Sequence, residues 1–229
     1  MKGLIIKDIL NLRNYMKQLI LVFVFFIAYG IFLKNGVFVG SMITLMLSMQ
    51  VITTMSYDEY AKWDKYALTM NINRKDIVLS KYVFFIMSIM IGILVGIISS
   101  SLINIISDSN VGIDEILVTS IMVPCIFAIL FSIIIPIVFK TGVEKARVVM
   151  MAIFFTPTIL VFIIFKMAEK ANIPMPDEAT LEMIFKSGLI GLIVLTILSI
   201  FISYKISLSI YNFRKIKIYI DNNCRKMLF

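Results

Sequence analysis

The sequence predicts an all-α membrane protein with six transmembrane helices. Hydrophobic residues make up 60% of the 229 residues, and only 16% are charged. The mean hydropathy is +0.99, which one soluble core cannot hide, because a domain of this size still exposes about a quarter to a third of its chain surface. Six apolar runs are long enough, or nearly so, to cross the ~30 Å hydrocarbon core as helices. These runs lie at residues 19–33, 37–55, 82–106, 116–139, 148–165 and 183–204.

The segment before the first run, residues 1–18, predicts an amphipathic helix at the membrane interface. Apolar side chains recur there at helical spacing, at Ile5, Ile9, Leu12 and Met16. They give the helix one apolar face. Two roles fit this segment, an anchor that fixes the tilt of the first span and a platform for a cytosolic partner.

The first span is short and is followed by a short turn. Run 19–33 is short for a full crossing, so Lys17 and Lys34 are expected to snorkel outward and extend it. The turn into run 37–55 consists only of Lys34, Asn35 and Gly36.

The connection at residues 56–81 contains the only tryptophan. Basic and acidic side chains alternate there with aromatic ones, a mixture that suits a protein contact better than phosphate binding. Asp58, Lys62 and Tyr66 follow one another at the i,i+4 spacing of a helix, and Asn73 can cap a second helix that leads into the third span. An interfacial aromatic belt with snorkelling lysines is the alternative.

The later spans carry small residues and prolines. Gly92 and Gly96 in the third span form a G-x-x-x-G motif that permits close approach of another helix. The last span is followed by a basic tail at residues 205–229. Three prolines inside the fourth and fifth spans predict kinks, at Pro124, Pro136 and Pro157.

Polar residues in the second and third spans are candidates for a translocation path. They lie on one stripe of each predicted helix, at Ser41, Thr44, Ser48, Ser100 and Asn104. The alternative is packing inside the membrane, in which each hydroxyl bonds to the preceding helical turn.

Basic residues predict the orientation. All but four of the 22 lysines and arginines fall on the side that holds both termini. By the positive-inside rule both termini are cytoplasmic, in a multi-pass protein of the plasma membrane. The net charge of +8 therefore needs no nucleic-acid partner. The four exceptions are Lys34, Lys166, Lys170 and Lys186.

The composition excludes several chemistries. There is no histidine, so Ser-His-Asp catalysis and His-ligated zinc are excluded, and we expect neither catalytic residues nor a metal site. No phosphate-binding glycine loop occurs, so another subunit would have to bind ATP. No span holds an ionisable residue near its centre, which disfavours ion-driven transport.

The connection and the start of the chain carry a resemblance to a known family. The stretch at 59–82 reads E-Y-A-K-W-D-K-Y-A-L-T-M-N-I-N-R-K-D-I-V-L-S-K-Y, and the chain opens with M-K-G-L-I-I-K-D-I-L. Together with the layout of spans, they resemble the permease subunits of ABC-2 type exporters. The similarity is closest to the small six-span permeases that export phenol-soluble modulins or antimicrobial peptides.

This resemblance implies a site and partners. In the family, the segment between spans two and three forms a coupling helix that docks on the ATPase subunit. The resemblance implies two copies of this chain, a homodimer, with two cytosolic ATPase subunits that bind the ATP and Mg, and amphipathic peptides as substrate. By this resemblance the contact residues are Glu59, Lys62, Trp63, Asp64, Lys65 and Tyr66, with Arg74, Lys75 and Asp76 at the next turn.

We therefore expect a permease subunit of an ATP-driven exporter in a bacterial plasma membrane, without enzymatic activity of its own. It would export amphipathic cytolytic or antimicrobial peptides. The alternative is an immunity or scaffold protein that spans the membrane several times without transport, which predicts no ATPase partner.

Overall fold

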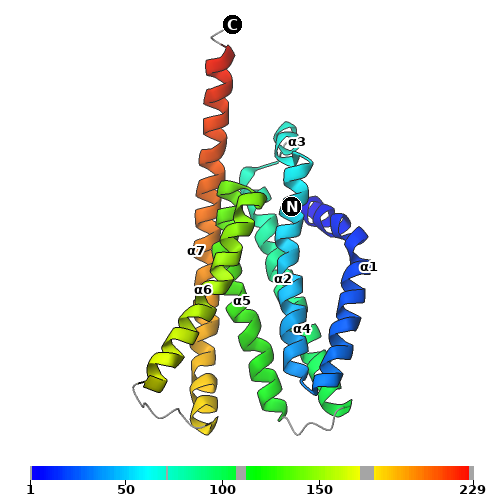
Figure 1. The fold of residues 1–229 in the computed structure, drawn as a ribbon. Coiled ribbons are helices and arrows are strands. Elements are labelled where there is room, and N and C mark those ends of the chain that lie inside the picture. Colours follow the sequence, from blue (N-terminus) through cyan, green and yellow to red (C-terminus); the bar gives the residue numbers. More distant parts are fainter. Residues whose placement is uncertain (1, 71, 107–111, 171–177, 227–229) are drawn as a thin grey trace.

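The computed structural model describes residues 2–70, 72–106, 112–170 and 178–226, with the side chains of residues 2, 14, 16, 64, 65, 68, 168, 169, 178–186 and 214–226 excepted. Every element within these ranges is a helix (Figure 1), which confirms the all-α prediction. The helices are α1 (Lys2–Leu33), α2 (Gly36–Tyr60), α3 (Trp63–Thr69), α4 (Arg74–Ile106), α5 (Ile113–Thr141), α6 (Val143–Lys170) and α7 (Glu178–Lys226).

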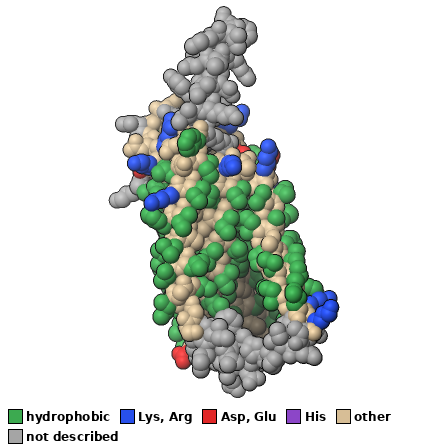
Figure 2. Space-filling view, turned by 90° about the vertical axis from the view of Figure 1, so that its left-hand side faces the viewer, with side chains coloured by type: hydrophobic (Ala, Val, Ile, Leu, Met, Phe, Trp, Pro, Cys, Tyr) green, Lys and Arg blue, Asp and Glu red, His purple; other side chains and the backbone are tan. Residues whose placement is uncertain are grey.

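The helices are longer than the apolar runs, because polar residues at the ends of each span continue the helix. Within the part of the chain that the structure describes, five helices are long and apolar enough to cross a membrane, and α1 makes six if its two parts count as one span. The predicted tail from residue 205 is not a separate segment, since α7 continues through it to Lys226. Hydrophobic side chains cover the middle of the face in Figure 2, as expected for a surface in contact with lipid.

Helix α1 joins the predicted interface helix and the first span. Its parts Gly3–Arg13 and Lys17–Leu33 are inclined to each other by 67°. The first part lies across the end of the bundle near α3, and the second runs along α4 (Figure 1). A tight turn then leads into α2, because Lys34 adopts a left-handed conformation with φ 54° and the Asn35 side chain accepts a hydrogen bond from Phe38 N.

The predicted helical spacing across Lys62 is wrong. Helix α2 ends at Tyr60, and Lys62 adopts φ 50°, so the chain turns before α3 begins. Asp58 forms ion pairs with Lys7 and Lys81. Helix α4 begins at Arg74, directly after the predicted cap residue Asn73, whose carbonyl accepts the first hydrogen bonds of the helix.

Helices α2 and α4 form the closest pair, and the G-x-x-x-G motif lies in their interface. A Cβ on Gly92 would lie 2.9 Å from the methyl group of Thr44, and the nearest contact of one on Gly96 would be Gly40. The absence of side chains at these positions allows the two helices to approach closely. The prediction of close helix approach is therefore confirmed.

Helix α5 is central and α6 is peripheral. Half of the most apolar window of α5 is buried, whereas none of that of α6 is. Only Gly142, at φ 86°, separates the two helices. The main core lies between α2, α4, α5 and the middle of α7, and Phe85 and Phe131 are completely buried within it.

Candidate functional site

Helix α3 lies at one end of the bundle, between the ends of α2 and α4 (Figure 1). We call this end of the bundle the α3 end. The opposite end, which holds the turn at Lys34, is called the far end. Lysine and arginine side chains gather mainly toward the α3 end in Figure 2. One side of α3 is buried and the other is exposed, since Ala67 is completely buried while Tyr66 is 61% exposed. The α3 end therefore presents a helix that is seated on the bundle and open on its outer face.

Trp63 seats α3 on the bundle. Its ring is half-buried and packs against the main core. The Lys7 ammonium lies 4.5 Å from the ring centroid, a distance typical of a cation–π contact. The predicted contact residue Trp63 is thus engaged within the chain itself.

Four charged side chains from three helices meet beside Trp63. Lys81 of α4 lies 2.8 Å from an oxygen of Asp8 and 2.7 Å from Asp58 of α2. Lys7 of α1 lies 2.5 Å from Asp58 and 3.3 Å from Asp8. We call this group the charge quartet. It has two positive and two negative side chains, as burial requires, because Asp8 is completely buried and Lys81 is 4% exposed.

Sequence reasoning missed the charge quartet, although a signal was present. Asp8 lies between Leu4 and Leu12 at i,i+4 spacing, and all three side chains are buried. The stripe that faces the bundle differs from the predicted apolar face, since Ile9 of that face is 48% exposed. A carboxylate between two apolar residues of one helical stripe requires a buried partner, which the sequence does not identify.

Glu59 connects the end of α2 to the start of α6. Its carboxylate accepts a hydrogen bond of 2.6 Å from the backbone N–H of Val143. This bond satisfies one of the free donors at the N-terminus of α6, where a negative charge is also favourable. Glu59, like Trp63, has a structural contact within the chain.

The other predicted contact residues lie on both sides of α3. Lys62 is exposed, as are Arg74 and Lys75 on the first turn of α4, where Asp76 is half-buried. The side chains of Asp64 and Lys65 lie outside the described residues. The exposed members at the α3 end are thus mainly basic and aromatic.

The predicted path residues separate into two groups. Thr44, Ser48 and Ser100 are buried. Thr44 and Ser48 donate to carbonyls of the preceding turn, and Ser100 donates to the Gly36 carbonyl at 2.9 Å. Hydroxyls bonded in this way fill a helix interface.

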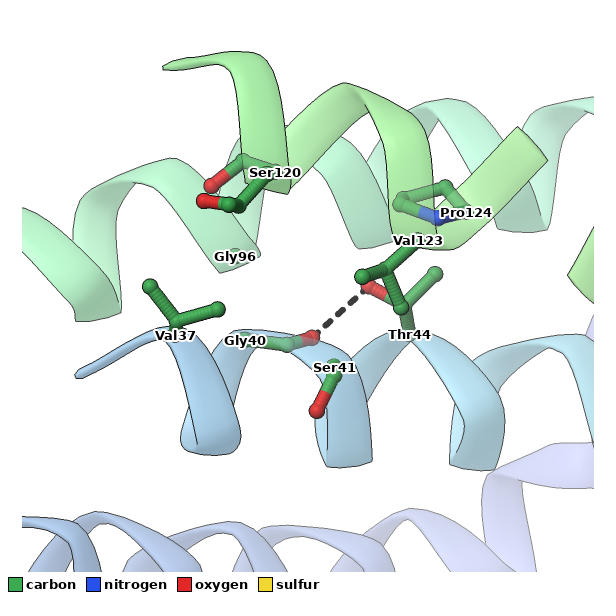
Figure 3. A pocket seen from close by; sticks show the side chains of 9 residues that line it. Val37, Gly40, Ser41, Thr44, Gly96, Ser120, Val123 and Pro124 are labelled. Atoms are coloured by element: carbon green, nitrogen blue, oxygen red, sulfur yellow. Dashed lines mark hydrogen bonds between the residues drawn. The ribbon is translucent and has the colours of Figure 1, made fainter. Parts of the chain in front are cut away.

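Ser41 and Asn104 lie nearer to open space. Ser41 donates to the Phe38 carbonyl and lines a narrow gap between α2, α4 and α5 (Figure 3), whose volume of about 10 Å³ is close to that of one water probe. Asn104 lines a cavity of about 420 Å³ at the far end, with Lys34 and Glu115 at its polar margin.

A second polar cluster lies inside the bundle. The Tyr82 hydroxyl is 2.6 Å from Ser203 Oγ and 2.7 Å from Ser207 Oγ, and Ser203 also donates to the Ser132 carbonyl. The cluster joins α4, α5 and α7. The i,i+4 spacing of Ser203 and Ser207 indicates a shared helix face, but only the fold places Tyr82 opposite it.

The family comparison covers nearly the whole fold. A family model described as "ABC-2 family transporter protein" matches residues 3–212. The chain belongs to the ABC-2 transporter family. The match runs from the start of α1 to residue 212 of α7, so it includes α3 and the charge quartet. No curated protein and no solved structure matches the chain.

The family assignment fixes the general role. An ABC-2 family chain is the transmembrane permease component of a transporter, it is not itself the catalytic component, and the family implies a partner ABC ATPase. This supports the predicted multi-pass membrane permease over the alternative of a non-transporting immunity or scaffold protein.

Proposed function

We propose that this ABC-2 permease exports amphipathic peptides and that α3 is its docking element for the ATPase. The observation that carries the proposal is the seating of α3. A helix of seven residues stands outside the spans with Tyr66 exposed, and Trp63 and the charge quartet connect its base to α1, α2 and α4. A displacement of α3 by a partner would therefore reach three of the long helices.

The contact residues divide into docking and positioning groups. Lys62, Tyr66, Arg74 and Lys75 are exposed at the α3 end and would touch the ATPase, with Asp64, Lys65 and Asp76 assigned to the same surface on sequence grounds. Aromatic and arginine side chains are typical anchors of such interfaces. Trp63 and Glu59 would act through the position of α3, because both have contacts inside the chain.

The transport cycle would use two copies of this chain and two ATPase subunits. ATP and Mg, bound by the ATPases, would supply the closing motion of those subunits. In this chain, α3 would receive that motion and pass it to α2 and α4. Both termini would lie on the ATPase side, in a bacterial plasma membrane.

A cavity at the α3 end supports an amphipathic peptide as cargo. It has a volume of about 380 Å³ and opens between α1, α2 and α6. Its lining combines the apolar residues Met49, Ile52 and Met150 with Tyr15, Tyr57, Tyr60 and Arg147. Methionine and tyrosine side chains adapt to one apolar and one polar face of a peptide helix.

Co-purification with the ATPase tests the docking role. The chain is expressed with the ABC ATPase that its family implies, and the complex is isolated in mild detergent. The double variant Lys62→Ala, Tyr66→Ala should lose the ATPase while keeping its elution volume and helical content. Phe32→Ala, which removes an aromatic ring that is 81% exposed at the far end, is the matched control and should keep it.

Peptide uptake tests the cargo. Inverted vesicles that contain the complex should accumulate a fluorescent amphipathic peptide only when ATP is hydrolysed. A scrambled peptide of the same composition without an apolar face should not accumulate. A chain that remains without an ATPase partner under all conditions would contradict the proposal that it is part of an exporter. Equal uptake of both peptides would contradict only the proposal that amphipathic peptides are its cargo.

A further inference from the structure

The charge quartet consists of two halves that are each neutral. Lys7 and Asp8 belong to the first part of α1, whereas Asp58 and Lys81 belong to α2 and α4. When these parts are in contact, Lys81 pairs with Asp8 and Lys7 pairs with Asp58. Each half also contains its own pair, Lys7 with Asp8 at 3.3 Å and Lys81 with Asp58 at 2.7 Å.

This division has a physical consequence. Separation of most buried ion pairs leaves an uncompensated charge on each side. Here the first part of α1 can leave the bundle with Lys7 and Asp8 still paired, and the bundle retains Asp58 and Lys81 as a pair. The electrostatic barrier to separation is therefore much lower than the burial of Asp8 and Lys81 alone would suggest.

The same segment has the geometry of a separate body. Its axis is inclined by 67° to the rest of α1, and it contacts the core through Leu4 and Leu12. Ile6 and Leu10, on its other side, are 55% and 56% exposed. A few apolar contacts and one neutral charge group therefore hold it on the bundle.

We propose that Gly3–Arg13 is a latch that docks and undocks through the charge quartet, and that Asp8 and Lys7 position α3 through Trp63. In the docked state, Lys7 covers the ring of Trp63. In the undocked state, Lys7 leaves with the latch, and α3 loses the contact between Lys7 and the Trp63 ring. The role of the latch in transport rests on the proposed function, but its docking is a property of this chain alone.

The double variant Asp8→Lys, Lys81→Asp, which we call the charge exchange, distinguishes a latch from a fixed brace, that is, from a segment that never leaves the bundle. The docked state of this double variant is still neutral, but the latch half then carries two positive charges and the bundle half two negative ones. Each half loses its own pair, so undocking requires separation of unlike net charges. A fixed brace would keep its two ion pairs across the contact, whereas a latch would be locked, because undocking would leave two like charges together in each half.

Trp63 reports docking directly, because it is the only tryptophan of the chain. Quenching of its fluorescence by iodide is measured on the purified full chain in lipid nanodiscs. Asp8→Asn leaves the docked site with one unpaired positive charge, which should shift the docked-to-undocked ratio by about 100-fold and raise the quenching constant about twofold or more. The charge exchange should give a constant at or below that of the unmodified chain.

Two further variants keep the experiment decisive. Arg13→Gln removes an exposed charge from the same segment outside the quartet and should leave the quenching constant unchanged. Lys7→Met removes the cation over the Trp63 ring but keeps Asp8 and Lys81, and it should raise quenching even if Asp8→Asn does not fold. Circular dichroism and elution volume establish folding for each variant.

The transport assay supplies the second readout. The charge-exchange complex should bind the ATPase normally yet lose most ATP-dependent peptide uptake. Full uptake by this variant, or equal quenching in Asp8→Asn, Lys7→Met and the unmodified chain, would overturn the latch. Failure of ATPase binding in the unmodified chain would instead reject the proposed function and leave the fluorescence result to decide on docking.

Discussion

Glu59 and Val143 are joined by a hydrogen bond of 2.6 Å between a side-chain carboxylate and a backbone N–H. The two residues are separated by 84 positions in the sequence, and they bring the end of α2 to the turn between α5 and α6. Because α6 has no buried residue in its most apolar window, this bond and the buried Val143 and Ala146 attach the start of that helix to the bundle.

Removal of the Glu59 carboxylate should loosen α6. Glu59→Ala is expected to lower the free energy of unfolding by about 1 kcal/mol, as the loss of a side-chain helix cap does. The midpoint of thermal unfolding in detergent measures the effect. Glu144→Ala removes an exposed carboxylate from the first turn of the same helix and should change the midpoint less. Equal effects would indicate that only the charge near the helix end matters.

Gly142 should not tolerate a side chain. Its φ of 86° favours glycine, and a Cβ there would lie 2.5 Å from Glu59 Oε1. Gly142→Ala is expected to cost about 1–3 kcal/mol and to displace the Glu59 carboxylate. The control is Gly112→Ala, since nothing lies within 4 Å of a Cβ at that position. Similar unfolding midpoints for the two variants would argue against the described turn.

The interface between α2 and α4 predicts a third effect. A Cβ on Gly36 would lie 2.7 Å from the backbone oxygen of Ser100, and backbone cannot move away as a flexible side chain can. Gly36→Ala should therefore lower the free energy of unfolding by about 1–3 kcal/mol. Gly191→Ala in α7 meets nothing within 4 Å, so its unfolding midpoint should stay within about 2 °C of the unmodified chain or rise slightly.

The polar cluster at Tyr82 predicts a smaller effect. Tyr82→Phe leaves the hydroxyls of Ser203 and Ser207 without their tyrosine partner and should cost ~1 kcal/mol, the order of a hydrogen bond between helices in a membrane. Tyr29→Phe, at a ring that is 43% exposed, is the control. A Tyr82→Phe chain as stable as the control would show that the serines find other partners.

The fold was predictable because hydropathy is a local property of the sequence. Five of the six predicted spans coincide with helices that are apolar and long enough to cross a membrane, and α1 contains the sixth. The helix ends were less predictable, since polar and charged residues continue α4 and α7 well beyond the apolar windows. An interface helix followed by a span implies a change of direction in α1, but its position between Arg13 and Lys17 could not be read from the sequence, because α1 contains no proline.

The candidate site was predictable as a segment but not as a set of contacts. Residues 56–81 indeed contain a short helix between two spans. The spacing of Asp58 and Lys62 predicted one helix through both residues, yet the chain turns at Lys62. Asp58 instead pairs with Lys7, which is 51 positions away, and with Lys81. Interactions between distant helices decide such pairs, and no local pattern encodes them.

The seam between α2 and α4 has a mechanical consequence for α3. Ser100 and Gly36 are bonded at the far end of the pair, and Lys81 and Asp58 at the α3 end. Two helices fastened at both ends resist being spread apart. A push on α3, which connects them, should therefore tilt α2 and α4 together and displace their ends at the opposite surface of the membrane.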